Sequence, residues 1–255
     1  MLSTGGTAIF DEEMISEFYE RELITEVVGE LKAGKEAQVF VCRANPQTGY
    51  GLLAAKVYRE RSQRAFRSEA DYLEGRSSLR RGRSRGASVT RAIDRRSRVG
   101  KELLSATWVR REYEVLVRLH RAGVPVPAPL ACAEHAVLMQ YLGDEEASAP
   151  RLVSAALDQQ EAGRYRAVLL AAVAEMLREG LIHGDLSPYN VLMFRGGPWI
   201  IDLPQCVDAA VHPDGLRLLR RDVTNLTRHF AHYGLPDDGD AVSERLWDAY
   251  MRADL

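Results

Sequence analysis

Apolar residues follow a strand-like pattern in three places near the N-terminus. The three segments cover residues 23–31, 36–43 and 51–58, and a helical pattern over residues 10–21 precedes them. In the middle segment apolar and polar positions alternate, as expected when successive side chains point to opposite faces of a sheet. The first part of the chain is therefore predicted to be rich in β-strands.

Helical periodicity dominates the later part of the chain. A helix is predicted over residues 159–178, where apolar residues recur at helical spacing and Gly180 supplies a stop signal. Its predicted core positions are Val168, Leu169, Ala172, Val173, Met176 and Leu177. Two more helices are predicted over residues 214–232 and 240–253.

One further helix ends near Arg121, and an acidic residue interrupts its apolar stripe. The stripe is formed by Trp108, Val115, Leu116 and Leu119. Glu112 falls within it, and a buried carboxylate costs several kcal/mol unless a cation pairs with it. The natural partner is Lys56, on the third predicted strand. Glu114 points away from the stripe and is predicted to be exposed.

Length and composition fit a single α+β catalytic unit with two lobes. The chain has 255 residues, 46% of them hydrophobic, which is enough to bury two modest cores. We place a small β-rich lobe at residues 1–138 and a mainly helical lobe at residues 139–255. Three scattered cysteines argue against a disulfide framework or a zinc site and suggest a reducing compartment. Without a signal peptide or a long apolar span, the expected location is cytoplasmic, with no membrane contact.

The segment from Gly75 to Lys101 differs sharply in composition from its surroundings. It carries nine arginines against a single acid, Asp94, with serines between them and few apolar residues. Such a segment cannot bury itself. Residues 75–105 are therefore predicted to form a flexible insertion. Their charge would suit RNA or a ribosomal particle as a partner, and the alternative is a solvated surface loop that has no partner.

Three residues with the chemistry of phosphoryl transfer lie close together in the sequence. The run from His183 to Asn190 contains Asp185, and Asp202 follows an apolar hairpin over residues 191–201. Asp185 would orient the acceptor hydroxyl, while Asn190 and Asp202 would hold Mg²⁺ on a nucleotide. We interpret His183 as a scaffold for this loop rather than as an acid or base.

A glycine-containing turn between the first two strands predicts a flap over the nucleotide phosphates. The spacing from Gly29 to Lys35 would be a P-loop if Ser or Thr came next, but Glu36 follows, and a strand rather than a helix comes after it. Gly34 would allow close approach of the backbone to the phosphates. Lys32 or Lys35 would supply positive charge.

With these motifs in order along most of its length, the chain resembles the RIO family of atypical serine/threonine protein kinases, and it is closest to the first, bacterial-type subfamily. The matching residues are Gly34-Lys35-Glu36-Ala37, Lys56, Glu112, His183 to Asn190, Ile201-Asp202 and Gln205. The resemblance implies a two-lobed protein-kinase-like fold, with ATP and Mg²⁺ or Mn²⁺ as cofactors. It implies transfer of the γ-phosphate to serine and threonine hydroxyls of proteins, itself included. A further implication is that Asp202 is transiently phosphorylated in an ATPase cycle.

The resemblance also assigns nucleotide contacts. Lys56 stands in the place of the kinase lysine that contacts the α and β phosphates, with Glu112 as its partner. Backbone groups between Met139 and Gly143 would hydrogen-bond adenine, with Met139 or Leu142 packed against it. The full expected set of nucleotide-binding residues is Lys32, Gly34, Lys35, Glu36, Lys56, Glu112, Met139, Tyr141, Leu142 and Pro150.

Departures from these patterns keep two other functions open. Ordinary serine/threonine kinases place a lysine where Ser187 stands, so charge stabilisation here would rest on the metal and the flap lysines. Pro204-Gln205 is closer to the second RIO subfamily. The first alternative function is a small-molecule phosphotransferase of the aminoglycoside or choline type, for which a histidine would be expected at position 187. The second is a nucleotide-regulated RNA-binding module that uses the arginine-rich insertion.

Overall fold

The computed structural model divides the chain into two compact units. It describes residues 12–34, 37–58 and 98–255. The first unit comprises the residues up to Tyr113 and Pro129–Tyr141, and the second comprises Glu114–Ala128 and Leu142–Leu255. The predicted boundary between residues 138 and 139 differs from this division. Glu114–Ala128 belongs to the second unit, where Ile200 N donates to Pro125 O at 2.7 Å. Met139 belongs to the first, because it pairs with Ala54.

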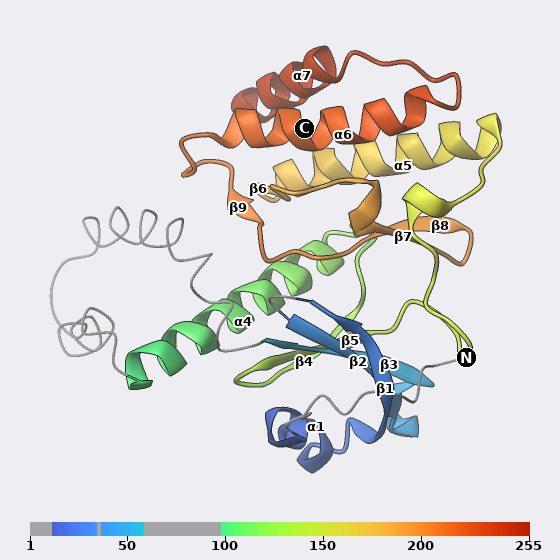
Figure 1. The fold of residues 1–255 in the computed structure, drawn as a ribbon. Helices are drawn as coiled ribbons and strands as arrows, with labels where there is room; N and C mark the ends of the chain where they lie inside the picture. The colour runs from blue at the N-terminus through green and yellow to red at the C-terminus, as the bar shows by residue number, and fades with distance from the viewer. Residues whose placement is uncertain (1–11, 35–36, 59–97) are drawn as a thin grey trace, which may run out of the picture. The chain divides into compact units, whose positions relative to one another are not determined.

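A five-stranded antiparallel sheet in the order β1-β2-β3-β5-β4 forms the centre of the first unit (Figure 1). The strands are β1 (Ile24–Ala33), β2 (Ala37–Ala44), β3 (Leu52–Tyr58), β4 (Pro129–Cys132) and β5 (Ala136–Gln140). The three strands predicted near the N-terminus are confirmed. Strand β4 was not predicted, because prolines before it indicate an extended segment, yet a proline is tolerated as the first residue of an edge strand.

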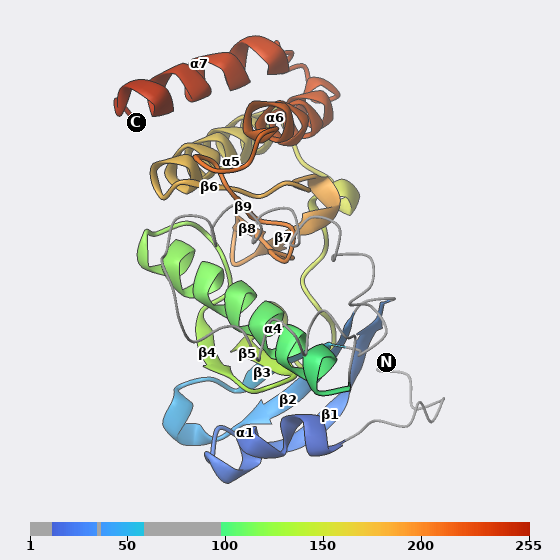
Figure 2. The ribbon, with the colours of Figure 1, turned by 90° about the vertical axis from the view of Figure 1, so that its left-hand side faces the viewer.

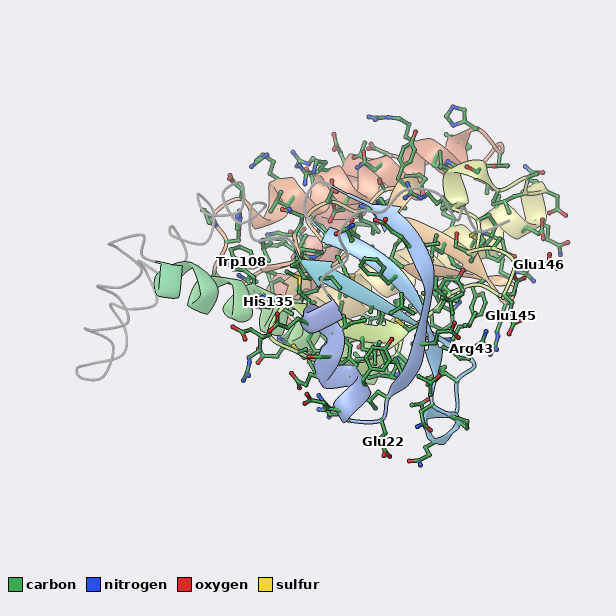
Figure 3. The ribbon with its side chains drawn as sticks, turned by 60° about the horizontal axis from the view of Figure 1, so that its bottom comes forward. Glu22, Arg43, Trp108, His135, Glu145 and Glu146 are labelled. Atoms are coloured by element: carbon green, nitrogen blue, oxygen red, sulfur yellow. The ribbon has the colours of Figure 1, made fainter. Side chains whose placement is uncertain are left out.

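Short helices surround this sheet. The predicted helix over residues 10–21 is, in its described part, a 3-10 turn η1 (Glu12–Ile15) and one turn of α-helix, α1 (Ser16–Glu20). Another 3-10 turn, η2 (Pro46–Thr48), connects β2 to β3. Glu22, labelled in Figure 3, has a positive φ of 53° and forms the turn from α1 into β1.

The two faces of the sheet have different surroundings. Phe40, Leu53 and Ala55 pack with Ile15 and Phe18 in the main core of the unit. The opposite face carries a smaller apolar cluster centred on Val41, Ala54 and Tyr141, with Val28, Leu31, Val39, Leu52 and Met139 against it. Lys56 shares this second face with Ala54, because side chains two residues apart point the same way.

Helix α4 (Arg98–Arg121) is longer than predicted. It begins within residues 75–105, which the sequence assigned to the flexible insertion. That assignment is wrong from Arg98 onward, because the segment changes there to Lys, Glu and Leu, which favour helix. The rest of the insertion up to residue 97 lies outside the described residues. Gly123 follows the helix at a φ of +79°, a left-handed conformation that glycine adopts without strain.

Three helices, side by side in Figures 1 and 2, make up most of the second unit. They are α5 (Gln159–Arg178), α6 (Gly215–Ala231) and α7 (Gly239–Arg252), and all three were predicted. Asp158 and Glu161 form a capping box at the start of α5. The prediction that Val168 belongs to the core of α5 is wrong. Val168 is 38% exposed, because it lies at the edge of the apolar stripe.

Small elements complete the second unit and position its loops. They are η4 (Leu152–Ser154), β6 (Leu181–Ile182), η5 (Pro188–Asn190), β7 (Val191–Phe194), β8 (Gly197–Ile200) and β9 (Val207–Asp208). The β7–β8 hairpin was predicted, whereas β6 and β9, at two residues each, are too short to show a pattern. Within the described parts of the chain, every helix is too short or too polar to cross a membrane.

Candidate active site

The loop between β6 and β7 brings two of the predicted site residues together. Asn190 Nδ2 donates to the backbone oxygen of Asp185 at 2.8 Å and to its carboxylate Oδ2 at 3.3 Å. The turn η5, closed by a bond of 2.9 Å from Asn190 N to Ser187 O, sets this geometry. The Asp185 carboxylate is exposed and held in orientation by a neighbouring amide.

Asp202 reaches this loop through the β7–β8 hairpin. Ile201 N donates to Asn190 O at 2.9 Å, so Asp202 leaves the hairpin directly beside the start of β7. Asp202 is exposed and has a φ of +69°. This left-handed conformation costs about 1–3 kcal/mol for a residue other than glycine, although aspartate is among the residues that tolerate it best. The fold thus keeps Asp202 at the catalytic loop in a strained conformation.

The donor atoms of Asn190 and Asp202 suit Mg²⁺. Because Asn190 uses Nδ2 on Asp185, its Oδ1 is left to face a cation, and the Asp202 carboxylate supplies a second oxygen. Mg²⁺ prefers oxygen ligands and keeps several waters or phosphate oxygens, so one or two protein ligands are enough. In the described residues there is no group of three or more His, Cys, Asp or Glu side chains that would hold a metal by itself.

His183 is a buried link between the catalytic loop and the segment that carries Asp202. Its Nδ1 accepts from Asp185 N at 3.3 Å, and its Nε2 lies 3.2 Å from Ile201 O. These contacts require a neutral ring with the proton on Nε2. Burial lowers the pKa of His183, although the bond to Ile201 and the charges of Asp202 and Asp185 oppose this shift. The arrangement agrees with the predicted scaffold role.

Gly184 packs directly against the segment that follows Asp202. Its φ is +79°, and a Cβ atom at this position would lie 2.6 Å from Gln205 O. Any side chain would therefore collide with backbone and also strain the main chain. This close approach gives a physical role to two residues, Gly184 and Gln205, that the family resemblance identified only as matches.

Asp222 on α6 is a functional residue that the sequence analysis missed. Its buried carboxylate accepts from Gly184 N at 2.8 Å and from Leu186 N at 2.9 Å, on either side of Asp185. Asn225, one turn further along α6, donates to Leu186 O at 3.0 Å. Burial raises the pKa of Asp222 to about 7, and the two backbone bonds act against that rise.

A signal for Asp222 was present in the sequence. It falls on the buried stripe of its helix with Leu218, Leu219, Val223 and Leu226. The argument that identified Glu112, an acid within an apolar stripe, applies equally to this position. The sequence alone, however, offers no cation as its partner, because the actual partners are backbone N–H groups.

The predicted ion pair between Lys56 and Glu112 is confirmed within the first unit. Lys56 Nζ lies 2.8 Å from Glu112 Oε1, with side-chain exposures of 11% and 6%. The Lys56 ammonium also lies 5.3 Å from the centre of the Tyr58 ring, a cation–π distance. Glu114 is exposed, as predicted. The pair connects β3 to α4 and fixes the position of the ammonium group.

The flap residues are placed only in part. Gly34 directly follows β1, and its nitrogen donates to Ala37 O at 2.9 Å, which closes the turn. A Cβ on Gly34 would lie 2.9 Å from the same oxygen. Lys32 is exposed on β1. Lys35 and Glu36 lie outside the described residues, and their nucleotide contacts stay predictions.

The residues expected to bind adenine belong to both units. In the first, Met139 and Tyr141 pack on the sheet face that carries Lys56. In the second, Leu142 is buried and its oxygen accepts from Ala149 N at 2.8 Å. Pro150 is exposed, and its oxygen accepts from Met193 N at 2.8 Å. Their contacts with a nucleotide stay predictions.

Comparison with known proteins gives a consistent result. Residues 38–242 match the RIO domain family. The chain is 34% identical to the RIO-type serine/threonine-protein kinase Rio1 of Haloferax volcanii, over 85% of this chain and 67% of that protein. It is 29% identical to the human serine/threonine-protein kinase RIO1, over 84% of this chain but only 35% of that protein.

A solved structure has the same fold. The Rio2 kinase from Chaetomium thermophilum, in an ADP/Mg²⁺-phosphoaspartate complex, superimposes with a TM-score of 0.63 at 22% identity. The match covers 95% of this chain and 70% of that one. The predicted two-lobed kinase-like α+β fold is therefore confirmed.

The close approach at Gly184 predicts a specific loss of stability. Gly184→Ala must accept both a left-handed alanine, costing about 1–2 kcal/mol, and a collision with Gln205 O. Gly196→Ala is the matched control, because Gly196 has a φ of +75° with no atom within 4 Å of a Cβ. Urea unfolding should show a larger loss for Gly184→Ala. Equal losses would contradict the packing described above.

The raised pKa of Asp222 predicts a pH-dependent stability. In the unfolded chain an aspartate has a pKa of about 3.9, so between about pH 4 and 7 the folded chain holds a proton that the unfolded chain has released. The contribution of Asp222 to stability is therefore greatest below pH 4 and is lost as the pH rises to about 7. Asp222→Asn cannot titrate. The free energy of unfolding of the wild type relative to this variant should fall across that range, and a constant difference would refute the shift.

Proposed function

This chain belongs to the RIO domain family of atypical serine/threonine kinases, and on that premise we propose that it transfers the γ-phosphate of ATP to serine and threonine hydroxyls of proteins, its own included. The observation that carries the proposal is the meeting of Asp185, Asn190 and Asp202 at one loop. The ion pair between Lys56 and Glu112 supports it. Both the sequence match and the motifs favour this activity over the small-molecule phosphotransferase that the sequence left open.

Each residue has a defined task in the proposed reaction. The exposed carboxylate of Asp185, oriented by Asn190, accepts a hydrogen bond from the acceptor hydroxyl and positions it for attack. Asn190 Oδ1 and the Asp202 carboxylate would hold Mg²⁺, which would neutralise charge on the phosphates. Lys56 contacts the α and β phosphates. Glu112 keeps its ammonium in place.

Charge stabilisation differs from that of ordinary kinases. Ser187 stands where those enzymes have a lysine, so no cation of the catalytic loop faces the transferred group. In the proposed reaction, the metal and Lys32 and Lys35 of the flap would stabilise the charge on the transferred phosphoryl group. We expect slow turnover in consequence. Slow turnover suits a second proposed role, in which the Asp202 carboxylate takes up the phosphoryl group and hydrolysis of the acyl phosphate completes an ATPase cycle.

For the partners of this protein we propose only a class of molecule. The chain matches about a third of the length of the human relative. The partners of that longer protein are therefore not assigned to this chain. RNA or a ribosomal particle is the proposed partner of residues 75–97, on the arginine content of that segment alone. A cytoplasmic location stays a prediction of the sequence.

Two substitutions separate metal binding from chemistry. Asp185→Asn should leave the rise in melting temperature with Mg²⁺ and ATP nearly intact, but should cut transfer from γ-labelled ATP by roughly 10²- to 10⁴-fold, because its role lies in the transition state. Asp202→Ala should abolish the metal-dependent part of that rise. A full thermal shift in Asp202→Ala would exclude Asp202 as the metal ligand. If hydroxylamine releases the label from the wild-type protein, the transferred phosphate was bound to the protein as an acyl phosphate.

A double-mutant cycle tests the ion pair. Lys56→Met and Glu112→Gln should each reduce ATP turnover, and the double variant should lose little more than either single variant, because each residue acts mainly through the other. Glu114→Gln, on the exposed side of the same helix, is the control and should have no effect. Additive losses would show that Lys56 and Glu112 act on turnover independently and not as a pair.

A further inference from the structure

Helix α6 carries an unbalanced charge. It contains four arginines, Arg217, Arg220, Arg221 and Arg228, and its one acid is Asp222, which is buried. Arg220 faces α7, where it pairs with Asp240 at 3.4 Å and with Glu244 at 2.8 Å. The other three arginines are exposed. The chain as a whole has a formal charge of -2, so this excess of positive charge is local.

The three exposed arginines form one strip along the helix. Positions 217, 221 and 228 fall on the same side of an α-helix, and at 1.5 Å per residue they span about 16 Å. We call them the arginine strip. Arg217 pairs with Asp214 at 3.0 Å. Among the residues that the structure describes, neither the Arg221 nor the Arg228 guanidinium group makes an ion pair or a hydrogen bond, although the charge of Arg221 acts on the adjacent carboxyl of Asp222 and opposes the rise that burial causes in its pKa.

The strip lies next to the catalytic loop. Arg221 directly precedes Asp222, which binds Gly184 N and Leu186 N on either side of Asp185. Asn225, one turn after Arg221, contacts Leu186 O. Helix α6 also contacts β6, from which the loop emerges. The ring of Tyr189 on the same loop is 57% exposed.

We propose that the arginine strip binds an acidic segment of the protein substrate and so presents a nearby serine or threonine to Asp185. This inference rests on the proposed kinase activity and specifies its substrate class. Charge complementarity supports it, because two exposed guanidinium groups that make no ion pair or hydrogen bond within the described residues can attract carboxylates and bind them in a planar, bidentate manner. The length is also suitable, since about 16 Å matches roughly five residues of extended chain.

A protein segment fits better than a nucleic acid. Arg221 of the strip directly precedes Asp222, which binds the backbone on both sides of the residue that receives the acceptor hydroxyl. Tyr189 on the same loop is exposed and can offer a polypeptide an apolar contact. The three arginines lie in one line along α6, an arrangement that one extended polypeptide can follow.

Two peptides with the same central serine test the proposal, one flanked by glutamates and one by alanines. The wild type should phosphorylate the acidic peptide with the lower KM, and rising ionic strength should remove the advantage. The double variant Arg221→Gln/Arg228→Gln should raise the KM for the acidic peptide by roughly 2- to 30-fold, as expected for two exposed ion pairs. Its activity on the neutral peptide should not change. Arg228→Glu, six residues from Asp222, should have the same effect without disturbing the loop.

The matched control is Arg245→Gln, an exposed arginine on α7. Equal losses in this control, or equal KM values for the two peptides with the wild type, would overturn the proposal. So would tighter binding of an oligouridylate than of the acidic peptide, if that binding is lost in the double variant. Fluorescence anisotropy with the labelled acidic peptide reports binding without catalysis. Binding by the wild type but not by the double variant, with no phosphate transferred to any peptide, would refute the kinase proposal and keep the docking strip.

Discussion

The buried carboxylate of Asp222 is the contact on which the catalytic loop depends. It accepts hydrogen bonds from the N–H groups of Gly184 and Leu186, so the backbone on both sides of Asp185 is held in place. His183 adds a second attachment, to the segment before Asp202. A buried acid with two backbone donors is expensive to disturb, because its removal leaves both N–H groups unsatisfied. Asp185 can therefore be exposed to a substrate and still hold one orientation.

In the first unit, the buried acid Glu112 has a similar positioning role. Glu112 holds the Lys56 ammonium, whereas Asp222 holds a stretch of backbone. In each case a helix supplies a carboxylate from its buried side. Glu112 positions the ammonium group of Lys56, and Asp222 positions the backbone on either side of Asp185. The two acids differ in what their loss would cost. Without Glu112 a nearly buried cation remains, and without Asp222 the loop itself loses its support.

Helix α6 combines support of the loop with a surface of its own. Its inward side carries Asp222 and Asn225 to the catalytic loop, and its exposed side carries the arginine strip. Helical periodicity is the reason that both can be present within a few residues. A substrate bound to the strip would thus be held by the same helix that holds the group acting on it.

Most of the helices and strands and the main chemical groups could be identified from the sequence alone. Period and stop signals predicted α5, α6, α7 and the strands around Lys56, and an acid within an apolar stripe identified the pair of Lys56 and Glu112. The sequence did not determine the support of the loop. Asp222 binds residues 36 and 38 positions away, and Gly184 fits against Gln205, which follows a hairpin. Periodicity shows which side of an element is buried, but the partner on that side is chosen by packing between segments distant in the chain.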